Sequence, residues 1–101
     1  MQIMAIVTRA QGRTDADVAG YRVPEGQSVW ALYKSSVVRG MWSRTDSPGA
    51  LLLLEVAGRA AARDAMTSLP MVRDGLVEFQ LIELAPFLGL EYLFSAQARD
   101  A

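Results

Sequence analysis

Three stretches of this chain have apolar residues at both sets of alternating positions, or nearly so. They cover residues 3–7, 50–56 and 76–84, and the middle one includes four consecutive leucines, Leu51 to Leu54. Successive side chains of a strand point to opposite faces of its sheet, so four leucines in a row place apolar groups on both faces. The pattern therefore predicts strands whose two faces are both covered.

Two helices are predicted between these strands. The first is indicated by apolar residues at spacings of three and four, which are Val29, Trp30, Tyr33 and Val37. Pro24 and Glu25 suit its first turn, because proline loses no hydrogen bond there and the helix dipole favours a carboxylate. The second helix, residues 59–68, is rich in alanine and is predicted to bury Ala62, Ala65, Met66 and Leu69. Thr14 is expected to cap a short helical turn before Gly20.

The rest of the pattern completes the fold. Residues 37–45 are typical of a strand, and Asp46-Ser47-Pro48-Gly49 after them is typical of a tight turn into the leucine-rich strand. The order is then β-α-β-β-α-β, which predicts an α+β, ferredoxin-like domain with a four-stranded antiparallel sheet. Two helices cover only one face of such a sheet. The other face is therefore predicted to pack against a second copy, giving a homodimer through the sheet faces or a higher oligomer.

Composition narrows the class of protein and its partners. A chain of 101 residues, half of them apolar, suits one domain, predicted over residues 1–92 with a flexible tail at 93–101. A net charge of −1 argues against a nucleic-acid partner. No apolar stretch reaches the roughly 20 residues that cross a bilayer, and the N-terminus is typical of a strand, so we expect a cytoplasmic protein without membrane contact. The preference for arginine over lysine favours a bacterial source.

The chain contains neither cysteine nor histidine. This excludes disulfides, thiol nucleophiles, Cys/His zinc sites and serine–histidine catalysis. Asp15, Asp17 and Glu25 lack the spacing of a calcium loop, so neither a metal nor another cofactor is expected. Any general acid or base must be an aspartate, a glutamate, a tyrosine or the single lysine, Lys34.

Residues 39–84 carry a resemblance to a known family. It rests on RGMWSR with Arg39, Met41 and Trp42, on LLLLEV, on Ser68-Leu69-Pro70, and on Val77-Glu78-Phe79 followed by Leu84. These segments resemble the muconolactone isomerase-like family of dimeric α+β barrels. The resemblance implies a homo-oligomer that shuttles a proton on a small lactone without a cofactor, in the breakdown of aromatic compounds. It also implies that Glu78, and more loosely Glu25, stand where that family has acidic residues.

A substrate pocket is predicted on the faces of the second and fourth strands. Alternation puts Glu78 and Gln80 on one face of the fourth strand, where polar groups need partners or a ligand. The hypothesis is a small pocket that these two residues edge, together with Arg39 or Arg44, and that is walled by Trp42 and Tyr33. An arginine there would bind a substrate carboxylate through two hydrogen bonds, and Glu78 would move the proton.

A structural interpretation competes with each of these assignments. Glu78, Gln80 and the arginines are alternatively rim residues, or an ion pair across the dimer. Glu25 is the second catalytic candidate, and its alternative role is to compensate the helix dipole. Tyr33 and Trp30 are alternatively core residues on the helix stripe.

After the last strand the chain carries six more large apolar side chains, which are Phe87, Leu88, Leu90, Tyr92, Leu93 and Phe94. Such a cluster would be a liability on the surface of a monomer. We expect these side chains to close the partner's barrel or to form a higher-order contact, in preference to binding a membrane.

Two functions remain open at this point. The first is a cofactor-independent, isomerase-like enzyme for a small anionic lactone, which the set Arg39, Trp42 and Glu78 favours. The second is a non-catalytic dimeric module that binds a small ligand or stabilises a partner. It is favoured by three departures from the family that the chain resembles: Gly40 and Ala50 stand where the resemblance implies a histidine and a polar residue, and Gln80 stands where it implies an acidic residue. A heme- or quinone-handling monooxygenase is disfavoured, because no histidine is available as an axial ligand.

Overall fold

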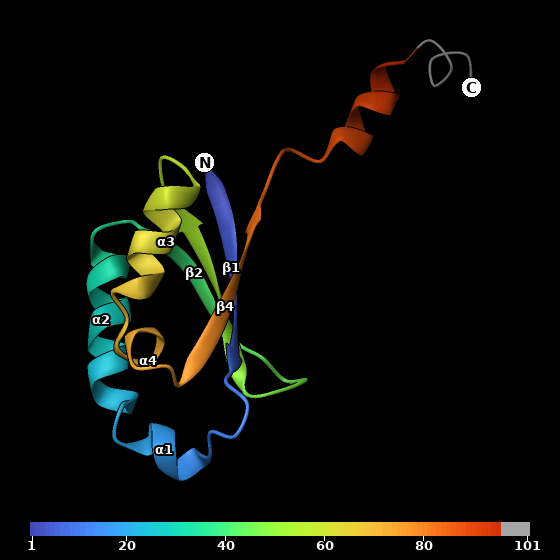
Figure 1. Cartoon of the computed structure of the whole chain (residues 1–101). Coiled ribbons are helices and arrows are strands. Elements are labelled where there is room, and N and C mark those ends of the chain that lie inside the picture. The colour runs from blue at the N-terminus through green and yellow to red at the C-terminus, as the bar shows by residue number, and fades with distance from the viewer. Residues whose placement is uncertain (96–101) are drawn as a thin grey trace.

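The strands and helices follow the predicted order (Figure 1). The structure is a computed structural model that describes residues 1–95. Its elements are β1 (Gln2–Arg9), α1 (Asp15–Ala19), α2 (Arg22–Lys34), β2 (Val38–Ser43), β3 (Gly49–Glu55), α3 (Arg59–Thr67), α4 (Pro70–Arg73), β4 (Val77–Glu83) and the 3-10 helix η1 (Leu88–Phe94). The strands form one antiparallel sheet in the order β2-β3-β1-β4, with the helices α2, α3 and α4 on one face. This confirms the α+β, ferredoxin-like prediction.

Local signals set where the helices begin. The hydroxyl of Thr14 accepts a hydrogen bond from the Asp17 amide at 3.3 Å, and the Asp17 carboxylate accepts one from the Thr14 amide at 2.8 Å. This reciprocal pair is a capping box, and it confirms the predicted cap. In α2, Glu25 lies in the first turn as predicted, one residue after Pro24. The short helix α4, which begins at Pro70, was not predicted.

Replacing Thr14 by alanine is expected to destabilise the protein by about 1 kcal/mol, because one half of the capping box is lost. The hydrogen bonds from Thr14 hold the pKa of Asp17 below its ordinary value, so the cap is expected to weaken as the pH falls through that pKa. Urea unfolding at pH 7 measures the effect. Thr14→Ser keeps the hydroxyl, so equal losses in the two variants would contradict this role.

The core lies between the sheet and the helices. On the strands, the side chains that face the helices are buried, and these meet the buried sides of α3 and of the residues after it. The buried residues include Ile3, Ala5, Val7, Leu52, Leu54, Ala62, Met66 and Leu69. The predicted buried side of the second helix is therefore confirmed, with Ala65 partly buried.

The stripe predicted along α2 is only half correct. Val29 is partly buried against the core, as predicted, and so is Val37, although Val37 lies beyond the end of α2. Trp30 and Tyr33 are 58% and 47% exposed, so the interpretation of these two as core residues is wrong within one chain. Their rings stack on each other instead, with centroids 5.6 Å apart. A helix on a small sheet has room to bury only part of a wide apolar stripe.

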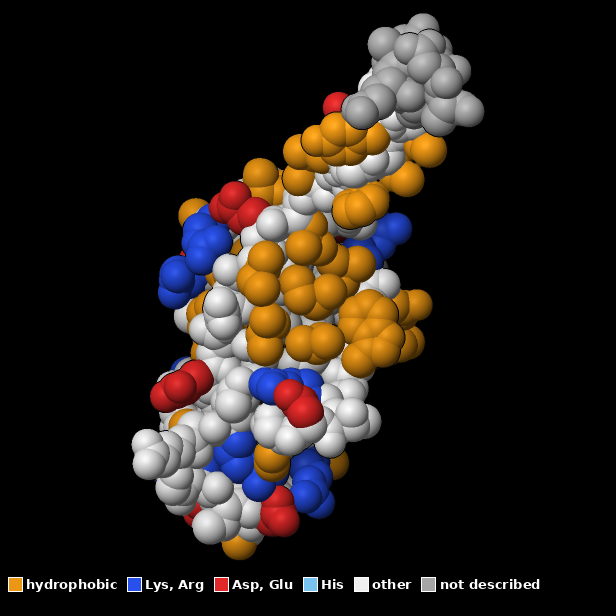
Figure 2. Space-filling model, turned by 90° about the vertical axis from the view of Figure 1, so that its right-hand side faces the viewer, with side chains coloured by type: hydrophobic (Ala, Val, Ile, Leu, Met, Phe, Trp, Pro, Cys, Tyr) orange, Lys and Arg blue, Asp and Glu red, His pale blue; other side chains and the backbone are white. Residues whose placement is uncertain are grey.

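The other face of the sheet is apolar too, and no helix covers it in the described part of the chain. Met4 pairs with Leu53 and Ile82, and Ile6 pairs with Leu51, so these side chains point away from the helices. Figure 2 shows the resulting patch at the centre of this face. We call it the open face, and it consists of Met4, Ile6, Trp42, Leu51, Leu53 and Ile82.

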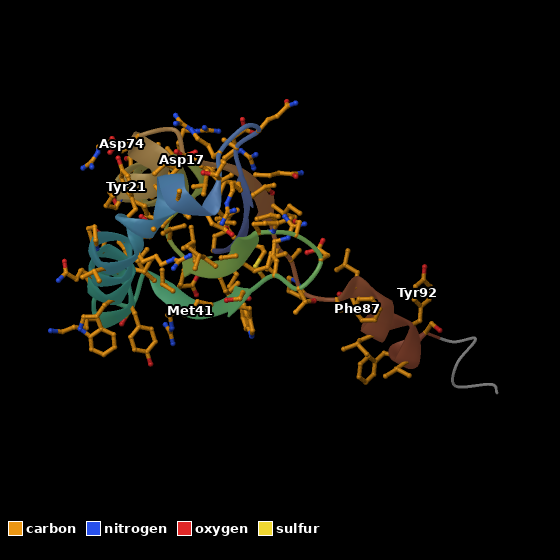
Figure 3. All side chains as sticks on the ribbon, turned by 90° about the horizontal axis from the view of Figure 1, so that it is seen from below. Asp17, Tyr21, Met41, Asp74, Phe87 and Tyr92 are labelled. Atoms are coloured by element: carbon orange, nitrogen blue, oxygen red, sulfur yellow. The ribbon has the colours of Figure 1, made fainter. Side chains whose placement is uncertain are left out.

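The chain leaves the sheet after Leu84, whose amide donates a hydrogen bond to the Gln2 carbonyl at 2.9 Å. Residues 85–95 then lead away from the body and end in η1, as Figures 1 and 3 show. We call this segment the C-terminal arm. Its Phe87 and Tyr92 side chains are both 75% exposed. The tail predicted from residue 93 falls mostly on residues 96–101, which lie outside the described residues.

Candidate functional site

A cavity of about 440 Å³ lies between the helices and the sheet. Its walls are mostly apolar and come from β1, β3, α2, α4 and β4, with Val7, Val29 and Val72 among them. Four polar side chains belong to its lining, and they are Arg9, Arg22, Glu25 and Ser43. An apolar cavity of this size with a few polar groups is typical of a site for a small molecule.

Glu25 is the acidic residue of this cavity. It lies in the first turn of α2 and is partly buried, and its Oε1 accepts a hydrogen bond from the Met71 amide at 3.0 Å. Burial raises the pKa of the Glu25 carboxyl above its ordinary value. The Met71 hydrogen bond and the charge of Arg73 act in the opposite direction, but less strongly. The Glu25 carboxyl therefore keeps its proton to a higher pH than the carboxyl of an exposed glutamate does.

A second contact holds α2 and α4 together near Glu25. The Tyr21 hydroxyl donates a hydrogen bond to Oδ2 of Asp74 at 2.8 Å (Figure 3). This bond to a carboxylate raises the pKa of the Tyr21 phenol. Tyr21 directly precedes α2 and Asp74 directly follows α4. The bond therefore holds the start of α2 close to α4. This is where the Glu25 side chain of α2 accepts the hydrogen bond from the Met71 amide of α4.

Two arginines reach the same cavity, and they differ in their partners. Nη1 of Arg9 lies 2.7 Å from Oδ1 of Asp15, so this guanidinium is engaged in an ion pair. Arg22 lies three residues before Glu25 on α2, one turn away on the same side of the helix. Among residues 1–95, the Arg22 guanidinium makes no hydrogen bond or ion pair. It is available to bind an anionic group of a ligand.

A second hollow, of about 390 Å³, lies between α2 and the edge strand β2. We call it the aromatic groove, and it is lined by Gly26, Val29, Trp30, Met41, Trp42, Ser43, Ala50 and Leu52. Both tryptophans of the chain belong to its lining, although the register of β2 turns the Trp42 side chain to the other face of the sheet. It adjoins the cavity, because the two share the residues Val29, Ser43, Ala50 and Leu52.

Most of the site residues predicted from the sequence lie on the sheet face opposite the cavity. Glu78 and Gln80 of β4 pair with Thr8 and Ile6 of β1, whose side chains point away from the helices. Both are exposed and border a shallow depression of about 180 Å³. Trp42 is on the same face and 52% exposed. The indole lies over Gly40, so closely that a Cβ added there would be 2.6 Å from Cη2.

Arg44 also reaches that face, where it is held by neighbours in its own chain. Its Nε and Nη2 donate hydrogen bonds to the Asp46 carboxylate at 2.9 and 2.7 Å, and its Nη1 donates one to Oγ1 of Thr8 at 2.8 Å. This ion pair raises the pKa of Arg44 and lowers that of Asp46. All three guanidinium nitrogens of Arg44 are thus engaged by residues of its own chain.

Within a single chain, the structure does not bring the residues of the predicted pocket together. Tyr33 lies on α2, on the far side of the sheet from Glu78 and Gln80, so it cannot wall the same pocket. Arg39 is exposed at the irregularity of β2 between Val38 and Gly40. The apolar spacing along the helix indicates which of its side chains share one side, but not which face of the sheet the helix covers.

The sequence interpretation missed Arg9, Arg22 and Ser43 as cavity residues. One signal was available for Ser43, because alternation along β2 puts it on the same face as Met41, where a polar group is unexpected. Arg9 is the last residue of β1, two positions beyond the apolar stretch 3–7 that predicts this strand. Arg22 precedes the predicted start of the helix by two residues, and no pattern indicated that its side chain would reach a cavity.

Two further classes of site are absent from residues 1–95. No group of three or more aspartate or glutamate side chains lies together as metal ligands would. No helix in this part of the chain is long and apolar enough to cross a membrane.

Comparison with known proteins bears on the fold. No protein-family model and no curated protein sequence matches the chain. Among solved structures, 5-chloro-2-hydroxyhydroquinone dehydrochlorinase from Burkholderia phenoliruptrix AC1100, in complex with 2,5-dihydroxybenzoquinone, is similar with a TM-score of 0.70. The match has 9% sequence identity and covers 84% of this chain and 94% of that one.

A second similar structure is that of muconolactone isomerase. It matches with a TM-score of 0.68 and 15% identity, over 86% of this chain and 93% of that one. The chain has the fold of muconolactone isomerase. The fold predicted from the resemblance is therefore confirmed, and identities this low show the fold alone.

Proposed function

We propose that this protein is a cofactor-independent enzyme that moves a proton on a small anionic lactone or a related ring compound. Glu25 acts as the general acid–base, and Arg22 binds the carboxylate of the substrate. The observation that carries the proposal is the partly buried Glu25 carboxyl in the lining of an apolar cavity, with a pKa raised by that burial.

The chemistry of Glu25 suits proton transfer. A glutamate whose pKa is raised toward neutral pH both accepts and returns a proton more readily than an exposed one. As a carboxylate, it takes a proton from the carbon next to the carbonyl group. It then returns that proton to another carbon of the resulting conjugated system. The substrate is isomerised with no atom gained or lost, so no oxidant or other reactant is needed.

Arg22 suits the binding of the substrate's anionic end. Its guanidinium has no partner among residues 1–95 and lies one helical turn from Glu25. A guanidinium recognises a carboxylate through two parallel hydrogen bonds, which fixes the orientation of a small molecule as well as its position. The apolar walls of the cavity contact the rest of the small molecule.

The two similar proteins give further support through the reactions in their names. A dehydrochlorination removes hydrogen and chlorine from neighbouring atoms, and an isomerisation of a lactone relocates a hydrogen. Both reactions start readily with the removal of a proton from a small ring compound. A cavity of about 440 Å³ has room for such a compound.

Turnover of muconolactone by the unaltered protein tests the proposal. We expect a change in the ultraviolet absorbance of the lactone that depends on protein concentration. Quenching of tryptophan fluorescence serves as a separate measure of binding, because both tryptophans line the groove next to the cavity. Absence of turnover across a series of small anionic lactones that do bind would contradict the proposed reaction.

A non-catalytic, ligand-binding module is the second candidate function. It is favoured by the small number of polar groups in the cavity, where Glu25 is the single acidic residue of the lining. This candidate predicts that the lactone quenches fluorescence but is recovered unchanged.

We also propose that the chain forms a homodimer through the open face, as the sequence predicts. The support is that the patch is apolar and that no helix lies over it in the described part of the chain. A contiguous apolar patch of this kind is typical of an interaction surface. A higher oligomer, a cytoplasmic location and a bacterial source stay predictions.

A further inference from the structure

We propose that the C-terminal arm of each subunit docks in the aromatic groove of its partner and forms the outer wall of the partner's cavity. The inference rests on the proposed homodimer. It assigns a second, reciprocal interface that adjoins the open face at Trp42, and it gives the partner a part in the candidate site.

The arm is built as a contact segment. It contains a folded element, η1, in which the Leu90 amide donates a hydrogen bond to the Phe87 carbonyl at 3.2 Å. Its large side chains are nevertheless exposed to solvent in the isolated chain, and they are Phe87, Leu88, Leu90, Tyr92 and Leu93. Figure 3 shows Phe87 and Tyr92 projecting from a segment that lies away from the helices and the sheet. A short helix that is apolar on several sides needs a covering surface.

The aromatic groove offers such a surface. Trp30 and Met41 are large and exposed there, and Trp30 stacks on Tyr33 beside it. Trp42 belongs to the lining at the edge strand β2, and its indole lies over Gly40. Aromatic and methionine side chains are enriched in the cores of protein interfaces, because they bury much apolar area and adapt to the partner's shape.

Charge also favours this pairing. Within the described part of the arm, Glu91 is the one charged residue. The two elements that form the groove carry exposed cations, Lys34 at the end of α2 and Arg39 in β2. Neither cation has a hydrogen-bond or ion-pair partner for its side chain among residues 1–95. Opposite charges at the rim would steer the arm toward the groove.

The arm cannot serve its own groove in the observed arrangement. The groove lies at the β2 edge of the sheet and the arm begins at the β4 edge, with β3 and β1 between them. Three strand spacings separate these edges by about 14 Å. The arm also leads away from the body instead of across the sheet.

A two-fold axis removes this separation. When two sheets face each other across an axis that runs along their strands, the β4 edge of one lies beside the β2 edge of the other. The last residue of β4 and the first residue of β2 lie at the same end of the sheet. Glu83 of β4 pairs with Ile3 of β1. Val38 of β2 is level with Ile3 as well, because both pair with Leu54 of β3. The arm thus starts beside the partner's groove. Seven residues of 3-10 helix span about 14 Å, enough to follow most of α2, about 20 Å long.

Docking would change the candidate site as well as the interface. The groove and the cavity share Val29, Ser43, Ala50 and Leu52. An arm seated in the groove therefore lies against a wall of the cavity and shields it from water. A dry cavity strengthens the hydrogen bonds and charges inside it.

Cross-linking between two differently marked chains tests the inference, and the absence of cysteine from the natural sequence makes the background low. One full-length variant carries Leu90→Cys on the arm. The other carries Gly26→Cys in the groove, where an added Cβ meets no atom within 4 Å. The two are mixed, allowed to exchange subunits and treated with a short bis-maleimide. The control pair combines Leu90→Cys with Ala16→Cys, an exposed position on α1.

We expect the arm–groove pair to give about 10²-fold more cross-linked heterodimer than the control pair, because docking raises the effective concentration. Equal yields from the two pairs, in a preparation that light scattering shows to be dimeric, would overturn the inference and leave the open-face dimer standing. A monomer by light scattering would overturn both. Muconolactone turnover is measured separately, so failure of the proposed reaction is distinguished from either result.

Tryptophan emission gives a second measurement that needs no cysteine. Trp30 lines the groove on α2, and Trp42 lines it at β2 but also belongs to the open face. Emission is therefore compared between variants of equal dimer content, so that a difference reports whether the groove is covered. We expect Leu90→Asp to shift the emission to longer wavelength and to increase quenching by acrylamide, because the arm no longer docks. Glu91→Gln, on the same arm, is the matched variant and is expected to shift it much less. Unchanged emission in Leu90→Asp at full dimer content would contradict docking.

Discussion

Replacing Glu25 by glutamine is expected to lower turnover of the lactone by about 10²–10⁴-fold, the usual contribution of a general acid–base. The substitution keeps the shape of the side chain. It also keeps an oxygen that can accept the hydrogen bond from the Met71 amide, which is 3.0 Å long in the unaltered protein. The fold and the binding of the lactone should therefore survive. Steady-state kinetics should show the loss in kcat, with KM little changed.

The same variant is expected to gain stability at neutral pH. Burial raises the pKa of Glu25, so the unfolded chain ionises this group at a lower pH than the folded protein does. The wild-type protein thus loses stability as the pH rises from the ordinary pKa of 4.5 to the raised one in the folded state. Glutamine carries no such penalty. Thermal unfolding of both proteins at pH 4 and pH 7 should show that the variant's relative stability is greater at pH 7.

Two other glutamates separate this assignment from its competitors. Glu83→Gln changes an exposed carboxylate that lies 3.8 Å from Arg59, outside the cavity, and is expected to leave turnover unaltered. Glu78→Gln tests the alternative catalytic residue on the opposite face of the sheet. A large loss of turnover in Glu78→Gln, together with full turnover in Glu25→Gln, would contradict the proposed role of Glu25. It would place the active site on the open face.

The acidic limb of the pH profile gives an independent check. If Glu25 acts as the base, kcat/KM should fall as the pH drops through the raised pKa of its carboxyl, above the ordinary value of 4.5. A limb at or below the ordinary value would indicate an exposed carboxylate instead. This measurement needs no variant, so it does not depend on how well any substitution is tolerated.

The fold was predictable because its signals are local or have strict periods. The leucine run fixes a strand with two apolar faces, and the observed register confirms it, with Leu52 and Leu54 in the core and Leu51 and Leu53 on the open face. The capping residues around Thr14 act within one turn. Such patterns need no knowledge of distant contacts, which is why α+β topology followed from them.

The site was harder to predict, because it depends on contacts between elements far apart in the chain. Glu25 meets the Met71 amide across 46 residues, at a helix that the sequence did not predict. Tyr33 has the spacing of a core residue, yet the sheet is too narrow to cover it. Alternation assigned Glu78 and Gln80 to one face correctly. It could not say that the cavity would form on the other face.

Replacing Leu53 by aspartate is expected to convert the protein from a dimer to a monomer. Leu53 lies at the middle of the open face, between Met4 of β1 and Gly40 of β2. In a symmetric dimer each copy would bury the new carboxylate without a partner, at a cost of about 3–5 kcal/mol. The dissociation constant should rise by about 10²-fold or more. Light scattering should then report the chain mass of 11.0 kDa in place of twice that value.

Ala60→Asp is the matched substitution, since it adds the same charge at an exposed position of α3 on the helical side. It should stay dimeric. If Leu53→Asp also stays dimeric, the subunits do not pair through the open face, and the two-fold arrangement that brings the β4 edge beside the partner's β2 edge loses its basis. If the unaltered protein is itself a stable monomer at micromolar concentration, the leucines of β3 remain exposed to water. The stability of the fold must then come from the helical side alone.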